Sequence, residues 1–128
     1  MKALLIGCVV AFLAPSLAFA EFRIRTVTSG QTKRMAVHIS WSKDCKSNGG
    51  AAKVLTRPQH GKLSNRIVDS TIQRNRTGSD TSCVGKTIKG FEVNYTSEPN
   101  FHGTDTFSLE VTTGSGKGFT DHYTVTVQ

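Results

Sequence analysis

The chain has 128 residues, of which 37% are hydrophobic and 20% are charged, and its formal net charge is +7. This length corresponds to one domain, and the basic charge favours anionic partners such as lipopolysaccharide, acidic glycans, membrane surfaces or nucleic acid. The lysines and arginines are scattered along the sequence, which argues against a continuous nucleic-acid-binding stripe.

The first twenty residues have the features of a secretory signal peptide. A basic start at Lys2 precedes an apolar run, and small residues at Ala18 and Ala20 form an A-x-A-like cleavage site. A membrane anchor is disfavoured because the run is interrupted at Pro15 and is too short to span a bilayer comfortably. A lipoprotein site at Cys8 would leave almost no apolar segment before the cut.

Cleavage after Ala20 would leave residues 21–128 as a single domain with a net charge of +6, because Lys2 is removed. We therefore expect a periplasmic or extracellular protein that is not an integral membrane protein and has no nucleic-acid partner in vivo. This domain keeps two cysteines, Cys45 and Cys83. In an oxidising compartment they predict one disulfide, and the alternatives of free thiols or a metal site have no CxxC spacing in their favour.

Alternation of apolar and polar residues predicts strands throughout residues 21–128, and no window has a convincing helical period. The clearest runs, in chain order, are FRIRTVT at 22–28, MAVHISW at 35–41, GFEVNY at 90–95, TFSLEV at 106–111 and HYTVTV at 122–127. Weaker candidates surround Val54-Leu55, Leu63, Ile67-Val68 and Ile72. In the first run, one face carries Phe22, Ile24 and Thr26, and the other carries Arg23, Arg25 and Val27.

Turn-forming residues separate these runs, as in KSNGG at 46–50, RPQHG at 57–61, RTGSD at 76–80 and TTGSGKG at 112–118. About seven short strands at this spacing predict an all-β fold, an antiparallel, immunoglobulin-like β-sandwich with one disulfide. Its interior is expected to hold Trp41, Phe91, Tyr95, Phe107, Leu109 and Tyr123. Glu92 and Glu110 alternate with core positions, so both are expected to face solvent.

The second half of the chain resembles a bacterial surface module. RPQHGKL at 57–63 is similar to the P-x-x-G-x-φ opening of cadherin-like, immunoglobulin-like repeats, with Pro58 and Gly61 at the matching positions. FEVNYTSEPNFHGTDTFSLEVTTGSG at 91–116 is similar to the remainder of that pattern, through Tyr95, Pro99, Phe101, Gly103, Asp105 and Phe107. The resemblance implies a β-sandwich, here as one exported module, that acts in adhesion, surface display or contact with proteins and glycans.

Elementary chemistry gives the residues at 99–107 structural roles. Pro99 cannot donate to a sheet ladder, Gly103 suits a backbone with positive φ, and Asp105 can accept from nearby backbone N–H groups and lock the turn. Phe101 and Phe107 are expected to face inward and anchor both ends of this corner. A weak metal contact at His102 and Asp105 stays open as an alternative, although zinc and copper sites need three or four converging ligands.

No motif predicts catalysis, because the serines lack a nucleophile elbow and the cysteines are expected to be oxidised. We expect no enzyme activity, no metal and no cofactor. The expected function is that of a binding module of the bacterial envelope or cell surface, with a protein or glycan partner. The alternative is a basic periplasmic protein that binds lipopolysaccharide or acidic glycans through Lys43, Lys46, Arg66, Arg74, Arg76, Lys86 and Lys89.

Overall fold

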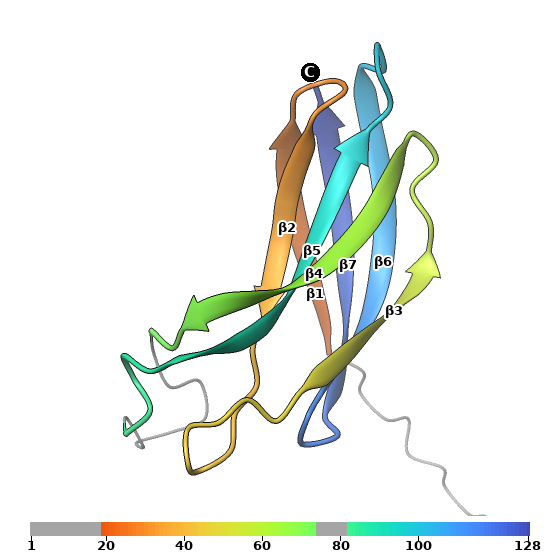
Figure 1. Cartoon of the computed structure of the whole chain (residues 1–128). Coiled ribbons are helices and arrows are strands. Elements are labelled where there is room, and N and C mark those ends of the chain that lie inside the picture. Colours follow the sequence, from red (N-terminus) through yellow and green to blue (C-terminus); the bar gives the residue numbers. More distant parts are fainter. Residues whose placement is uncertain (1–18, 74–81) are drawn as a thin grey trace, which may run out of the picture.

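The computed structural model describes residues 19–73 and 82–128, which form seven strands in two facing sheets (Figure 1). The strands are β1 (Ala20–Val27), β2 (Thr32–His38), β3 (Gly50–Thr56), β4 (Gly61–Thr71), β5 (Thr87–Ser97), β6 (Gly103–Thr113) and β7 (Gly118–Val127). Sheet 1 has the order β1-β7-β6-β3, and sheet 2 has the order β2-β5-β4. The all-β, seven-stranded fold predicted from the alternation is confirmed. Residues 1–18 of the predicted signal peptide lie outside the described part.

The core lies between the two sheets and follows the period of two along β6 and β7. Phe107, Leu109, Tyr123 and Val125 are at most 2% exposed, and fully burying an aliphatic or phenylalanine side chain contributes about 1.5–3 kcal/mol. Sheet 2 adds Tyr95, which has no exposed surface. These four expected interior residues, Tyr95, Phe107, Leu109 and Tyr123, are therefore buried, whereas Phe91 is only partly buried against the same core.

A second, smaller cluster surrounds the disulfide at one end of the sandwich. Cys45 and Cys83 are bonded, with their Cα atoms 5.2 Å apart, so the predicted pairing is confirmed. Ile72 and Ile88 are buried here, and Trp41 packs beside them half-buried rather than in the main core. Trp41 is displaced because β2 ends at His38, before the end of the predicted run. Closing a loop with a sequence separation of 38 contributes about 3–4 kcal/mol in the chain-entropy model.

Strand β1 departs from the expected antiparallel arrangement, because it pairs with β7 in parallel, from Ala20 opposite Thr120 to Val27 opposite Val127. The other strand pairs are antiparallel. The chain crosses from β1 in sheet 1 to β2 in sheet 2 within residues 28–31, so β1 runs opposite to β2 and alongside β7 (Figure 1).

A buried carboxylate on β7, Asp121, determines which face of β1 points into the sandwich. The side chain of Asp121 has no exposed surface, and Arg23 Nε lies 3.2 Å from its Oδ2. The register that turns Arg23 inward turns the apolar face of β1 outward, so Phe22 and Ile24 are 81% and 75% exposed. Arg23 and Arg25 thus share the inner face of the strand with the buried Val27, and Phe22 and Ile24 lie on its outer face. In the part of the chain that the structure describes, no helix is long and apolar enough to cross a membrane.

Candidate binding site

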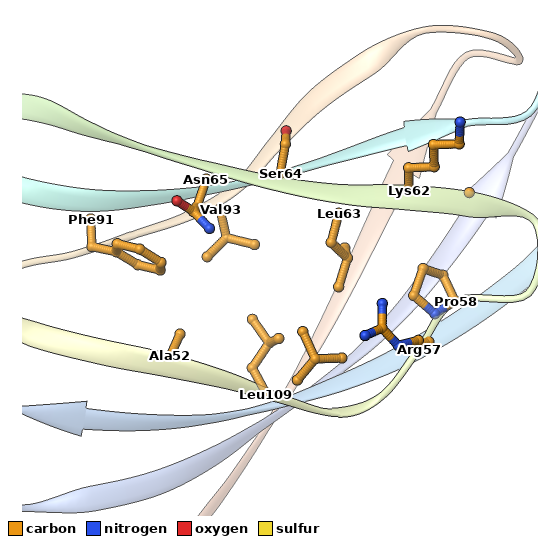
Figure 2. Close-up of a pocket in the computed structure, with 12 residues that line it drawn as sticks. Ala52, Arg57, Pro58, Lys62, Leu63, Ser64, Asn65, Phe91, Val93 and Leu109 are labelled. Carbon is orange, nitrogen blue, oxygen red and sulfur yellow. The ribbon is translucent and has the colours of Figure 1, made fainter.

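A groove of about 340 Å³ runs between the facing edges of the two sheets, along β3 and β4. Val93 and Leu109 form its floor and belong to the main core, at 4% and 2% exposed. Figure 2 shows the side chains around this space, with Arg57 and Pro58 at one end, Phe91 at the other, and Leu63, Val93, Leu109 and Ala52 between them. The core of the sandwich is therefore accessible from this side through an apolar opening.

The two strands that border the groove are edge strands. Among the described residues, β3 pairs only with β6 and β4 pairs only with β5. The ladder of β4 is regular over its whole length, from Gly61 opposite Ser97 to Thr71 opposite Thr87. The ladder of β3 shifts register between Val54 and Thr56. A bulge of this kind disrupts an edge, so β4 offers the longer and more regular template for another strand.

Exposed hydrophobic side chains concentrate beside the groove. Val54 and Leu55 on β3 are 36% and 47% exposed, and Ile67 on β4 is 65% exposed. A second exposed apolar group lies far away in the fold, on the outer face of β1. Along β3 and β4, this apolar surface lies beside the cavity.

The buried carboxylate of Asp105 fixes the end of the groove. Its Oδ1 accepts hydrogen bonds from the backbone N–H groups of Gln59 and Thr106, both at 2.9 Å. Its Oδ2 accepts from the N–H of His60 and the hydroxyl of Tyr95, also at 2.9 Å. Two of these donors belong to the loop between β3 and β4, so Asp105 locks that distant loop as well as its own strand.

The remaining residues of the cadherin-like pattern surround this lock. Pro58 and Gly61 line the groove, and a Cβ at Gly61 would meet the Tyr95 ring at 2.4 Å. Pro99 lies in the turn between β5 and β6, and Gly103 has a φ of 146°. Phe101 is half-buried against the core and stacks on the His60 ring, with the ring centroids 4.0 Å apart. Phe107 is buried between the rings of Tyr95 and Tyr123.

The basic residues predicted for anion binding occupy two separate places. Lys43, Lys46 and Lys86 lie within three residues of the disulfide cysteines, and Ser47 Oγ donates to the Lys89 carbonyl in the same region. Two of these cations are paired, Lys46 with Asp44 and Lys89 with Asp69. Arg66 lies apart from them, on β4. Arg74 and Arg76 fall outside the described residues.

The expectation that Glu92 faces solvent is wrong, because it is 1% exposed. It points to the outer face of sheet 2, as its position in the alternation requires, but Arg34 and Arg66 cover it from the two neighbouring strands. Hydrogen bonds from Arg66 and then from Asn94 lower the pKa of Glu92 below its usual value. Glu110 is exposed, as expected.

A second buried carboxylate, Asp121, was not singled out from the sequence. Besides Arg23, it lies 3.5 Å from His38 Nε2 and accepts a hydrogen bond of 3.1 Å from the Tyr123 hydroxyl. The signal was present, because Asp121 alternates with Tyr123 and Val125 on the apolar face of a strand.

In residues 19–73 and 82–128 no group of three or more His, Cys, Asp or Glu side chains could hold a metal ion. The sequence left open a weak metal contact at His102 and Asp105. Both oxygens of Asp105 accept hydrogen bonds from protein donors, so this carboxylate offers no free oxygen to a metal ion.

No protein-family model matches this sequence, and a search of curated proteins finds no related chain. The function must therefore be inferred from the groove and from the side chains themselves.

Proposed function

We propose that this chain is a non-enzymatic binding module that takes an extended segment of a partner protein along the groove between β3 and β4. The observation that carries the proposal is the apolar floor of Val93 and Leu109 beside two strands whose outer edges are unpaired among the described residues. An added strand would satisfy the free backbone groups of an edge, and its alternate side chains would fill the groove.

Strand β4 is the proposed docking edge. Its regular ladder extends over eleven residues, whereas β3 is shorter and bulged. Leu63 and Asn65 of β4 line the groove, Ile67 follows them in the alternation of the strand, and none of the three is charged. Inward-pointing charges are a common protection against strand addition, and this edge lacks them between 63 and 67.

The ends of the groove suggest the character and direction of the segment. Arg57 lies at one end, and the rest of the lining between it and Phe91 is mainly apolar. The matching segment alternates apolar residues over five to seven positions and carries an acidic residue at the end that meets Arg57. A protein partner is favoured over a glycan here, because a groove with an apolar floor offers few donors and acceptors for sugar hydroxyls.

The proposed location is the bacterial periplasm or cell surface. Support comes from the signal-like residues 1–20, the disulfide, and the resemblance to cadherin-like surface modules at 57–63 and 91–116. The polyanion-binding alternative has separate support from the lysines near the disulfide, and salt dependence distinguishes it from strand addition.

The test is capture of partners from the native envelope fraction by the tagged chain, compared between two variants that make the same change. Ile67→Lys places a charge beside the groove, and Ile24→Lys places one on the outer face of β1; the two side chains are 65% and 75% exposed in the parent. We expect a protein that is retained at high salt, lost with Ile67→Lys and kept with Ile24→Lys. Amide hydrogen exchange of the complex should then show new protection along β4.

Equal capture by both lysine variants would place the contact elsewhere and overturn the groove as the site. Capture that disappears at high salt in every variant would favour the polyanion-binding alternative. Each variant is first compared with the parent by thermal unfolding, because both substituted side chains are largely exposed and should leave the fold intact.

A further inference from the structure

The outer face of sheet 2 is a flat polar surface formed by three strands. Lys62 and Ser64 contribute to the groove lining, but their side chains extend away from its interior, as Figure 2 shows, and Arg66 follows them in the alternation of β4. On β5, the residues opposite these three are Thr96, Asn94 and Glu92. On the other side of β5, the β2 residue Thr32 lies opposite Thr96, and Arg34 lies opposite Asn94. Two arginines from the two outer strands thus flank one carboxylate on the central strand.

Glu92 contacts each of the two arginines at its Nε atom, with a different carboxylate oxygen for each. Its Oε1 accepts a hydrogen bond of 2.6 Å from Arg66 Nε, and its Oε2 lies 3.1 Å from Arg34 Nε. Asn94 Nδ2 donates to Oε1 at 2.9 Å and fixes the carboxylate from its own strand. The side chain of Glu92 is 2% exposed, but those of Arg34 and Arg66 are 63% and 68% exposed. The anchor is therefore buried while the cations remain on the surface.

The outer ends of both guanidinium groups are unoccupied within the described ranges. Each arginine is bound through Nε, and its Nη atoms have no hydrogen-bond or ion-pair partner among residues 19–73 and 82–128. Each Nη pair is a planar fork of donors, the geometry that matches phosphate oxygens bidentately. Strands β2 and β4 are separated by β5, so the two forks project from backbones roughly 10 Å apart.

This arrangement is a costly way to stabilise a sheet. Removing a carboxylate from water carries a large desolvation penalty, and an apolar side chain at the same position is often at least as stabilising. Ion pairs with exposed side chains such as those of Arg34 and Arg66 contribute little to the stability of the fold. What the arrangement does provide is orientation, because a buried carboxylate restrains two long and otherwise mobile side chains.

We infer that Arg34 and Arg66, held by Glu92, form a binding site for a phosphate ester on the outer face of sheet 2. The triad keeps a net charge of +1, and Lys62 adds another cation on the same face. A phosphate monoester presents three terminal oxygens, enough to accept from both forks at once. The hydroxyl and amide groups of Ser64, Thr96 and Asn94 lie in the adjoining rows and can bond the group that carries the ester. The two arginines lie apart from the groove, because neither of them lines it and both belong to the outer face of sheet 2.

The test is titration of the folded protein with three probes: inorganic phosphate, glucose 1-phosphate, and vesicles that contain phosphatidylglycerol. We expect the Nη proton resonances of Arg34 and Arg66 to shift with each phosphate probe that binds. The probe with the lowest dissociation constant identifies the source of the phosphate as free ion, sugar ester or lipid headgroup. Phosphatidylcholine vesicles at the same lipid concentration control for contact with membranes that carry no net charge.

Two variants separate fork geometry from charge. The double variant Arg34→Lys and Arg66→Lys keeps both charges but removes the forks, and it should weaken binding by about tenfold. Lys53→Gln removes a charge from β3 in sheet 1 and should leave binding within about twofold. Equal affinity of the double lysine variant and the parent would overturn the inference, as would equal losses in both variants. If the double variant does not fold, the titration of the parent still tests the inference. Arginine resonances that none of the three probes shifts would then overturn it.

Discussion

The hydroxyl of Tyr95 donates a hydrogen bond of 2.9 Å to Oδ2 of Asp105, and both side chains are buried between the sheets. Tyr95 belongs to β5 in sheet 2 and Asp105 to β6 in sheet 1, so this bond joins the two sheets directly. The same carboxylate holds the loop between β3 and β4. Burial, together with the hydrogen bond to Asp105, raises the pKa of Tyr95 well above its usual value, so the phenol remains a donor at all physiological pH values.

Removal of the Asp105 carboxylate should strongly destabilise the fold. Asp105→Ala leaves the backbone N–H groups of Gln59 and His60 unpaired, and the Tyr95 hydroxyl keeps only its 3.2 Å bond to the His60 carbonyl. We expect a loss of about 3 kcal/mol or more in the free energy of unfolding. Tyr95→Phe removes one donor only and should cost about 1–2 kcal/mol. Urea unfolding of both single variants and the double variant measures their coupling, and simple additivity would contradict the direct bond.

Gly61 cannot accept a side chain without displacing the Tyr95 ring. A Cβ at Gly61 would lie 2.4 Å from two ring carbons, and the ring is fully buried. Gly61→Ala should therefore destabilise the protein by about 1–3 kcal/mol. Gly118→Ala is the matched control, because Gly118 also begins a strand and its Cβ would lie at an ordinary 3.7 Å from the Val111 carbonyl oxygen. Equal melting temperatures for the two variants would argue against the close approach.

The disulfide should account for a large share of the stability. Replacing both Cys45 and Cys83 by serine should lower the free energy of unfolding by about 3–4 kcal/mol, because the unfolded chain loses the closed loop. Urea unfolding of the variant and of the reduced parent should give similar losses. Mass spectrometry after alkylation without reductant should find no labelled thiol at either cysteine, and two labelled thiols would contradict the pairing.

Asp121 should be essential for holding β1 to the sandwich. Asp121→Ala leaves Arg23, whose side chain is only 21% exposed, without its buried partner, and breaking a buried pair costs about 3–5 kcal/mol. We expect amide exchange in β1 to accelerate more than exchange in β6, because β1 is the edge strand next to β7. Arg25→Gln is the control, because Arg25 lies on the same strand and donates to the backbone carbonyls of Met35 and Ile24, not to Asp121. Equal acceleration in β1 and β6 would show general unfolding instead of local release.

Acid should lower the free energy of unfolding, in part because Glu92 becomes protonated. Its pKa is lowered in the folded state, so the unfolded chain binds more protons as the pH falls below about 4.5, the ordinary value. The stabilisation is therefore fully present above that pH and is lost as the pH falls through the folded pKa. Urea unfolding between pH 7 and pH 3 should show a shallower decline for Glu92→Gln than for the parent. Parallel declines would mean that Glu92 is not engaged by the arginines.

Local patterns in the sequence determined the strands, the disulfide and most of the core. Alternation along 106–111 and 122–127 predicted the buried positions of β6 and β7, because both strands lie inside sheet 1 and present one face to the core. The two cysteines left after the signal-like segment allowed only one intramolecular pairing. These features depend on chain geometry and composition, which the sequence contains directly.

Only the tertiary structure decided the groove, the parallel pairing of β1, and the burial of Glu92 and Asp121. Glu92 has the alternation of a solvent-facing residue and does point outward, but long side chains from β2 and β4 cover it. Phe22 and Ile24 have the alternation of core residues but are exposed, since Arg23 pairs with a carboxylate almost a hundred residues later in the chain. Periodicity assigns residues to the two faces of a strand, but the neighbouring strands determine which face is covered and by which charges.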